Sequence, residues 1–478
     1  MAPTAPPDAI VVGSGPNGLA AAVRLVQRGW TVEVREAEPS IGGGLRSLPL
    51  TLPGYIHDLC AAVHPLALAS PFLRGLPLGD HGLRWVHPPA PLAHPFDDGR
   101  AVLLHRSLAA TAAGLGEDGA AWERLFGPLA RSASTLVPAL LGPSRPNRHI
   151  VEMARFGADA LLPASRLATQ RFSRPEARAL FAGLAAHSFL RMDDPASAAF
   201  GLVLGVLGHA VGWPVAAGGS QRIAGALASL LESLGGRIVS DHRVTTMCDL
   251  PPVRAVLFDT DPAQVAAIAG DRLPPRFRDR LAAHAYGPGV FKLDYALEAP
   301  VPWHAPACGL AGTVHLGATL EEIAESEATV VGGGHPARPF VLIVQPSLFD
   351  PLRAPAGRHT LWAYCHVPNG STVDMTDRIE AQIERFAPGF RSRIIERRAS
   401  FPADLQRLNT NEVGGAINGG VQDLGTILRQ AAPWLSPYAT PDPSLYICSA
   451  STPPGGGIHG MCGFHAAEAA LRRLESAP

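Results

Sequence analysis

Residues 9–18 read AIVVGSGPNG, and this stretch decides the fold of the chain. Its four apolar residues predict a buried strand, and the glycines after them have the GxGxxG spacing. The spacing of apolar residues over 19–28 predicts a helix, and residues 31–35 predict a second strand that ends at Glu36. A strand, glycine turn, helix and second strand with a terminal acid are typical of a dinucleotide-binding βαβ unit.

Each part of this unit has a chemical reason. We expect Gly13 to form the tight turn, Gly15 to let the backbone approach a pyrophosphate, and Gly18 to let helix and strand pack closely. The helix N-terminus offers free N–H groups and the positive end of its dipole to the phosphates. Glu36 is expected to accept hydrogen bonds from ribose hydroxyls, and its charge disfavours a 2′-phosphate.

Two further glycine-rich stretches indicate which dinucleotide binds. Residues 42–44 are all glycine and are followed by Arg46, and residues 451–463 read STPPGGGIHGMCG ahead of a final predicted helix. With the first fingerprint, this combination resembles the FAD-dependent superfamily of amine oxidases, protoporphyrinogen oxidases and phytoene desaturases. The resemblance implies non-covalent FAD, with the C-terminal loop presenting backbone N–H groups to the flavin ring.

Shorter segments narrow the resemblance to the phytoene-desaturase-like branch, which includes the pyridine nucleotide-disulfide oxidoreductase domain-containing protein 2 group. They are residues 54–58 (GYIHD), 62–65 (AVHP), 186–188 (AHS) and 362–368 (WAYCHVP). The resemblance covers nearly the whole chain, although no disulfide motif is present. The residues predicted to bind FAD are Gly13, Ser14, Gly15, Pro16, Asn17, Gly18, Glu36, Ala37, Gly43, Gly44, Arg46, Val244, Gly456, Gly457, Ile458, His459 and Met461.

Three residues are candidates for the chemistry. Lys292 is the only lysine among 40 basic residues, and it lies in a predicted strand over 289–297. This segment resembles the one in amine oxidases whose lysine reaches a water at flavin N5. His57 and His64 follow the predicted FAD-binding unit, where an acid/base role and a purely structural role both stay open. His187 and His209 are interpreted as core residues, and no metal-binding cluster is apparent.

Composition restricts the partners and the location. The formal net charge is -1, without a basic stripe, so nucleic acid is not expected as a partner. Six scattered cysteines without a CxxC pair, and no secretory signal, predict a cytoplasmic protein with reduced thiols. Residues 195–221 carry no charge but contain several glycines. We interpret them as a buried helix and a loop, with peripheral attachment to a membrane left open.

These observations predict an α/β protein, α+β overall. A Rossmann-like FAD-binding domain (1–105, 211–288, 420–478) interleaves with a substrate domain of helices and a mixed sheet (106–210, 289–419). The uncharged helical region suits a hydrophobic substrate such as a polyene, isoprenoid or lipid, from which FAD removes hydride to form a C=C bond. An O2-using amine oxidase, a flavin-dependent isomerase and a non-catalytic FAD-stabilised scaffold stay open as alternatives.

Overall fold

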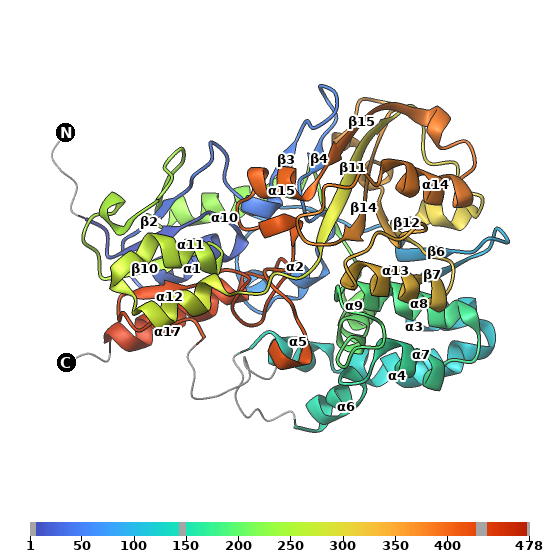
Figure 1. Ribbon diagram of the computed structural model, residues 1–478, viewed down its shortest axis with the longest axis horizontal. Coiled ribbons are helices and arrows are strands. Elements are labelled where there is room, and N and C mark those ends of the chain that lie inside the picture. The colour runs from blue at the N-terminus through green and yellow to red at the C-terminus, as the bar shows by residue number, and fades with distance from the viewer. Residues whose placement is uncertain (1–5, 143–149, 427–436, 476–478) are drawn as a thin grey trace.

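The computed structural model describes residues 6–142, 150–426 and 437–475, and two sheets dominate it (Figure 1). A five-stranded parallel sheet, in the order β16-β10-β1-β2-β9, lies at the end of the molecule that carries both termini. A seven-stranded mixed sheet lies at the other end. The predicted fold class is confirmed. The strands of the parallel sheet are β1 (Ala9–Val12), β2 (Val32–Arg35), β9 (Arg237–Val239), β10 (Ala255–Phe258) and β16 (Leu445–Ile447).

Helices cover both faces of the parallel sheet. Ala9 and Val11 of β1 point into a core shared with α1, α10 and α17, whereas Ile10 and Val12 point into a core shared with α11 and α12. This burial on both sides explains why β1 is apolar at every position. The helices packed on both faces therefore hold the glycine turn and the ends of the strands in fixed positions. The five helices are α1 (Pro16–Gln27), α10 (Gln221–Ser233), α11 (Pro262–Ala269), α12 (Pro275–Ala282) and α17 (Met461–Glu475).

The mixed sheet has the order β15-β11-β14-β13-β12-β6-β7, in which only β12 and β6 pair in parallel. Strands β6 and β7 thus lie with the second sheet, whereas the predicted boundary at residue 105 placed them with the first. Their place is set by pairing with β12, more than 200 residues later, which no local pattern reveals. The strands are β6 (Ala90–Pro95), β7 (Ala101–Leu104), β11 (Gly289–Leu297), β12 (Ala311–Leu316), β13 (Val341–Val344), β14 (His359–Val367) and β15 (Ile394–Ser400).

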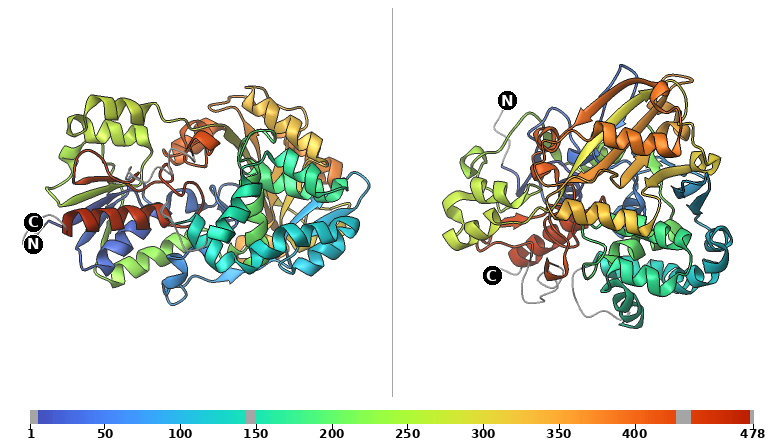
Figure 2. Two further views of the ribbon diagram at one scale, coloured as in Figure 1. Left: turned by 90° about the horizontal axis from the view of Figure 1, so that it is seen from below. Right: turned by 45° about the vertical axis from the view of Figure 1, so that its right-hand side comes forward.

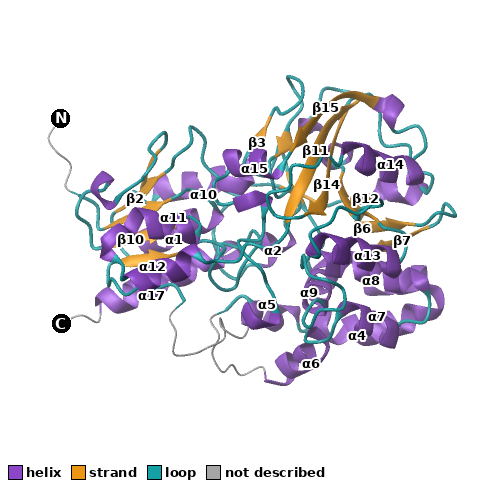
Figure 3. Ribbon diagram, in the orientation of Figure 1, coloured by secondary structure: helices purple, strands orange, loops and turns teal. Residues whose placement is uncertain are grey.

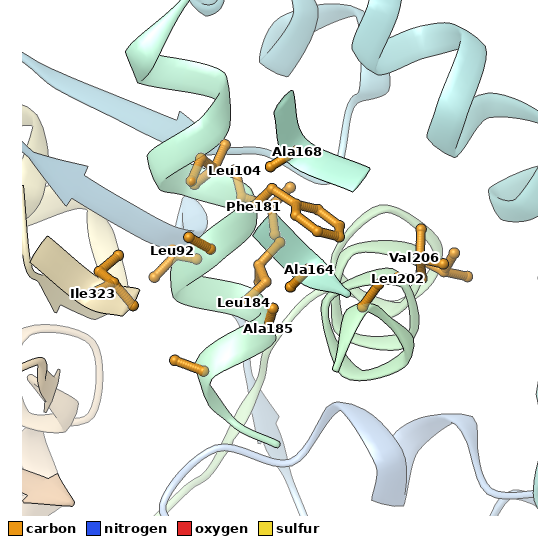
Figure 4. Close-up of a cluster of buried hydrophobic side chains, with 14 of the residues drawn as sticks. Leu92, Leu104, Ala164, Ala168, Phe181, Leu184, Ala185, Leu202, Val206 and Ile323 are labelled. Carbon is orange, nitrogen blue, oxygen red and sulfur yellow. The ribbon is translucent and has the colours of Figure 1, made fainter. Parts of the chain in front are cut away.

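Helices pack on both faces of the mixed sheet. On one face α14 (Thr376–Phe386) covers a core that includes Phe291 and Tyr295 of β11. On the other face a helical layer built mainly from residues 108–210 forms an extensive apolar cluster, part of which Figure 4 shows around Phe181 and Leu202. The helices of this layer are α3 (Leu108–Gly114), α4 (Gly119–Arg131), α5 (Ala133–Leu140), α6 (Ile150–Ala160), α7 (Ala164–Arg171), α8 (Pro175–Ala186), α9 (Ala198–Ala210) and α13 (Leu320–Val331).

Close packing explains the uncharged, glycine-rich stretch at residues 195–221. It forms α9 and a following loop, as the sequence predicts. A Cβ atom at Gly201 would lie 3.0 Å from the ring of Phe181, and one at Gly205 would collide with the ring of Phe126. The glycines therefore make room for aromatic rings of neighbouring helices. Across the three described ranges, no helix is long and apolar enough to cross a membrane.

After the strand at residues 237–239, the sequence predicts a further strand around Val244, and this prediction is wrong. Residues 241–250 form a loop that ends in a short 3-10 turn. The backbone N–H groups of Thr245 and Thr246 donate to the carboxylate of Asp249, so they are not available for a strand ladder. Figure 3 labels β3, α2 and α15 in the region between the two sheets, and Figure 2 gives two further views. A few short strands and helices lie outside the two large sheets and their helical layers. These are β3 (Ser47–Leu48), β4 (His57–Asp58), β5 (Trp85–Val86), β8 (Val215–Ala216), α2 (Pro65–Ala69) and α15 (Pro402–Leu408).

Candidate functional site

The glycine turn joins the carboxyl end of β1 to the N-terminus of α1. Gly13 has φ +101°, a left-handed conformation that favours glycine. Gly15 is the N-cap residue of α1, with no side chain to occupy the first N–H groups, and Pro16 follows. The first turn of α1 carries no acidic residue. The turn therefore has the form of an anion-binding helix N-terminus.

The carboxylate of Glu36 is held in place at the end of β2. It accepts hydrogen bonds from the backbone N–H of Ser14, at 2.9 Å, and from the Ser14 hydroxyl. Its other oxygen accepts the backbone N–H of Glu38 at 2.9 Å. The strand end and the glycine turn are thus joined through one acid, which lies where a ribose beside the pyrophosphate would need an acceptor.

The second glycine cluster packs directly on the first. A Cβ atom at Gly43 would lie 3.4 Å from the Cα of Gly15. Arg46, which is 4% exposed, donates to the carbonyl oxygens of Gly43 and Leu408. The guanidinium is therefore tied to two chain segments that meet at the site.

A single cavity runs from the glycine turn, across the gap between the sheets, to the helical layer. Glu36 and Arg243 line it beside the parallel sheet, whereas Trp213, Leu342 and Tyr364 line it beside the mixed sheet. Most residues predicted from sequence to bind the cofactor face this space. Those lining the cavity are Gly13, Ser14, Gly15, Pro16, Asn17, Glu36, Ala37, Gly43, Gly44, Arg46, Val244, Gly457 and Ile458.

Four predicted cofactor residues lie behind the cavity wall. The backbone of Gly18 packs on Gly13, where a Cβ atom would collide with the Gly13 carbonyl oxygen. Gly456 packs on Asn418 in the same manner. His459 is fully buried, and its Nδ1 accepts the backbone N–H of Met461 at 3.0 Å. In the structure these four residues shape the loops that line the cavity.

Lys292 and His57 also lie outside the cavity lining. The Lys292 ammonium donates to both carboxylate oxygens of Asp294, at 2.6 and 2.8 Å, and to the carbonyl oxygen of Asp58 at 2.9 Å. His57 lies beside the same carboxylate, with Nδ1 3.5 Å from it. Trp362, which does line the cavity, has its ring centroid 5.7 Å from the ammonium. Lys292 is therefore one residue removed from the space a substrate would occupy.

A larger ionic network surrounds this pair. The guanidinium of Arg353 is fully buried and binds the carboxylates of Asp58, at 2.8 Å, and Asp350, at 2.9 Å. Asp58 also accepts the backbone N–H of Ser220 at 2.8 Å. Together with the Lys292–Asp294 pair, the network joins four distant chain segments, which contain Asp58, Ser220, residues 292–294 and residues 350–353. It therefore fixes the junction between the two sheets.

Three histidines line or border the far part of the cavity. His64 lines it, binds Ser220 through Nε2 at 2.8 Å, and has no partner for Nδ1. His187 also lines it, and its Nε2 lies 3.1 Å from Nε2 of His315. Burial lowers the pKa of His64 to about 4 and that of His187 to about 3. Both imidazoles are therefore neutral near pH 7.

Glu412 is a functional candidate that the sequence did not reveal. It lines the cavity beside Gly44 and Cys60, is 4% exposed, and has one carboxylate oxygen without a hydrogen-bond partner. Burial raises the pKa of Glu412 to about 7. Burial, and then the neighbouring Glu412, raise the pKa of the Cys60 thiol well above its usual value. A carboxyl group that titrates near neutrality in a cavity is suited to proton transfer.

Other cavity residues were also missed by sequence reasoning. Trp362 and Tyr364 were quoted only as part of a resemblance, yet their alternation in a strand places both side chains on one face, with ring centroids 4.9 Å apart. Asp259 directly follows β10, and the rule that parallel strands end at one edge would have placed it beside Gly13. Within the described ranges, no group of three or more histidine, cysteine or acidic side chains is arranged to hold a metal ion.

The comparisons with known proteins agree with this architecture. The model of an NAD(P)-binding Rossmann-like domain matches residues 11–74. The mouse pyridine nucleotide-disulfide oxidoreductase domain-containing protein 2 is 26% identical, over 98% of this chain and 94% of its own length. A lycopene-forming phytoene desaturase of a Paracoccus species is 26% identical over 52% of each chain. The chain is a homologue of both proteins. Its relatives are oxidoreductases, and this chain is one as well.

Solved structures share the fold over the whole chain. A putrescine oxidase variant superposes with a TM-score of 0.65 at 18% identity, covering 99% of this chain and all of that one. An oxidoreductase from Methanosarcina mazei gives a TM-score of 0.65 at 17% identity, over 98% of this chain. Both superpositions include the parallel sheet and the mixed sheet together, so the two-sheet arrangement is common to these oxidoreductases.

Proposed function

We propose that this chain is an FAD-dependent oxidoreductase that removes hydride from a C–H bond of a hydrophobic substrate and forms a C=C bond. One observation carries the proposal: the cavity that begins at the dinucleotide turn continues without interruption to an apolar wall. Leu66, Leu204, Leu342, Val344 and Ile417 contribute to that wall. A nucleotide cofactor and an apolar substrate would therefore share one continuous cavity.

The residues present fit FAD. The glycine turn presents the N-terminus of α1 to the cavity, and Gly13 and Gly15 leave no room there for a side chain. Glu36 is oriented by two backbone N–H groups, and its charge opposes a 2′-phosphate. Gly457 and Ile458 approach from the C-terminal loop. We propose that these segments hold the cofactor without a covalent bond.

When bound, FAD supplies two-electron oxidation by accepting hydride. The protein must then take up the proton that leaves the neighbouring carbon atom. His64 and His187 are weak bases here because burial lowers the pKa of each imidazole. Glu412 is the better acceptor, since burial raises the pKa of its carboxyl to about 7 and one oxygen is unpaired. We assign proton uptake to Glu412, and exclusion of water to the surrounding apolar wall.

A specific observation favours oxidation of an amine as the second candidate. Trp362 and Tyr364 present an aromatic pair to the cavity, with the ring planes at 84°. Aromatic faces attract cationic groups, and the ionised form of Glu412 adds negative charge to the same wall. Putrescine oxidase, which shares the fold, is named for an amine substrate.

Anaerobic titration tests both functions. The purified protein should carry the absorption bands of oxidised flavin, and phytoene in detergent micelles should bleach them. Bleaching by putrescine instead would replace the first proposal with the second, and turnover of phytoene without bleaching would indicate isomerisation. Protein that stays colourless and does not take up added FAD would refute the assignment of the cofactor.

A further inference from the structure

A buried carboxyl group lies inside the glycine turn. Asp259 is 5% exposed, and its Oδ2 accepts the backbone N–H of Gly18 at 2.8 Å. A Cβ atom at Gly15 would lie 2.5 Å from the same oxygen, and one at Gly13 would lie 2.8 Å from the Asp259 carbonyl oxygen. All three glycines of the fingerprint thus close around one acid. An acid that lines the cavity here occupies the anion-binding N-terminus of α1 itself.

The surroundings offer this carboxylate no counter-ion. Glu36 approaches it from the end of β2, Cys448 from the end of β16 and Cys462 from α17. Burial raises the pKa of both thiols, so neither carries charge near neutral pH. The side-chain amide of Asn411 donates to the backbone carbonyl oxygen of Asp259, at 2.9 Å, and not to its carboxylate. In the described part of the chain no ion pair involves Asp259.

A dinucleotide brings two negative charges to this turn. Ionised Asp259 and the pyrophosphate would compete for the same N–H groups, and they would repel each other strongly because Asp259 is buried. We propose that Asp259 couples cofactor binding to the uptake of one proton, so that the dinucleotide binds to the form of the protein in which this carboxyl is neutral. The proton comes from solvent and rests on the carboxyl, whose O–H can then donate to a phosphate oxygen. The inference rests on the proposed FAD cofactor.

The ionisation of the empty site agrees with this arrangement. Burial raises the pKa of Asp259 well above its usual value, and repulsion by Glu36 raises it further, whereas the N–H groups of Gly18 and Gly15 act in the opposite direction. A bound pyrophosphate would raise this pKa again. Linkage then requires that the affinity is highest at low pH and falls as pH rises above the pKa of the empty site. The fall approaches about tenfold per pH unit, because each unit changes the neutral fraction about tenfold.

The variant D259N separates charge from shape. Asparagine keeps an oxygen for the Gly18 N–H and adds N–H donors, but it cannot ionise. We expect D259N to bind FAD with an affinity that does not change with pH and that equals or exceeds the affinity of the wild type at low pH. D261N is the matched control, because Asp261 also lines the cavity and caps α11 through the N–H of Ala263, a role that asparagine retains.

The experiment is calorimetric titration of the flavin-free full-length protein with FAD, and separately with ADP, from pH 5.5 to pH 9.5. ADP carries the pyrophosphate without the flavin; because its terminal phosphate itself titrates near neutral pH, the protons taken up are counted from the FAD titrations alone. Repeating the titration in two buffers of different ionisation enthalpy measures the protons taken up. We expect uptake in the wild type and in D261N, approaching one proton per cofactor above the pKa of the empty site, and none in D259N.

A wild-type affinity that is flat with pH would overturn the inference, and so would a slope that persists in D259N. If D259N does not fold, the wild type provides the test. Absence of proton uptake at every pH refutes the coupling. Proton uptake that begins only at the pH where the affinity starts to fall supports it. Failure of the wild type to bind either FAD or ADP at any pH would instead refute the proposed cofactor, and this inference with it.

Discussion

Lys292 and Asp294 form a buried ion pair within strand β11. Replacing Lys292 by methionine removes the cation, while Asp294, whose side chain is fully buried, keeps only His57 nearby, at 3.5 Å. The backbone carbonyl of Asp58 also loses its donor. Removing one partner of a buried ion pair costs about 3–5 kcal/mol, a large part of a typical free energy of unfolding of about 5–15 kcal/mol.

Urea unfolding, followed by tryptophan fluorescence, measures this loss. With a slope of about 3 kcal/mol per molar urea, the midpoint of K292M should fall by about 1–1.7 M. The double variant K292M/D294L removes both charges, and we expect it to recover most of the loss because apolar replacements of buried ion pairs are close to neutral. A K292M midpoint equal to that of the wild type would refute the argument that this pair stabilises the fold.

The same variant tests the catalytic role predicted from sequence. Where K292M is folded and binds FAD, the reduced protein is mixed with oxygen and flavin reoxidation is followed by stopped flow. A catalytic role of Lys292 predicts much slower reoxidation than in the wild type, whereas its observed binding to Asp294 and to the Asp58 carbonyl predicts an unchanged rate. Equal rates of reoxidation and of substrate reduction would confine Lys292 to its ion pair with Asp294.

Three further predictions concern the cavity and its support. E36A should weaken FAD binding by about 1.5–3 kcal/mol, measured by fluorescence titration, whereas E38A, the neighbouring acid, should leave the affinity almost unchanged; equal losses would contradict the role of Glu36. The rate of anaerobic flavin reduction should rise with pH through about 7, as Glu412 ionises, and E412Q should lower the rate and abolish the inflection; an inflection retained in E412Q would assign it to another group. G205V should destabilise the protein by at least about 1–3 kcal/mol in thermal unfolding, because its side chain collides with the ring of Phe126; an unchanged melting temperature would contradict the close packing.

Local patterns were sufficient for the first part of the fold. The strand, glycine turn and helix at residues 9–28 lie where apolar spacing and GxGxxG predict them, and strand β11 spans the predicted residues 289–297. These elements are encoded by neighbouring residues. Strands β6 and β7 were assigned to the other domain because their sheet is decided by pairing with β12, far along the chain. The strand expected at Val244 is replaced by a turn that Asp249 organises.

The part of the candidate site that is formed by backbone segments was predictable from the sequence. The part that is formed by side chains from distant segments was less so. The glycines and Glu36 line the cavity because their own segment forms it. Glu412 and Asp259 come from segments without a motif, and only the assembled sheets bring them to the glycine turns. Lys292 is the only lysine in the sequence. Its position in a buried ion pair, in which the side chains are 0–3% exposed, is a structural reason for a lysine at this position.

The order of the strands in the parallel sheet has a consequence for biosynthesis. The central strand β1 is the first to leave the ribosome, but its neighbour β10 is made some 240 residues later, and β16, which completes the edge, follows near the C-terminus. Gly457 and Ile458, which close the cavity, are translated later still. At about 5–20 residues per second, β1 waits at least about ten seconds for β10. The nascent chain therefore presents an unfinished nucleotide site until β10, β16 and the glycine-rich loop around Gly457 have all been translated.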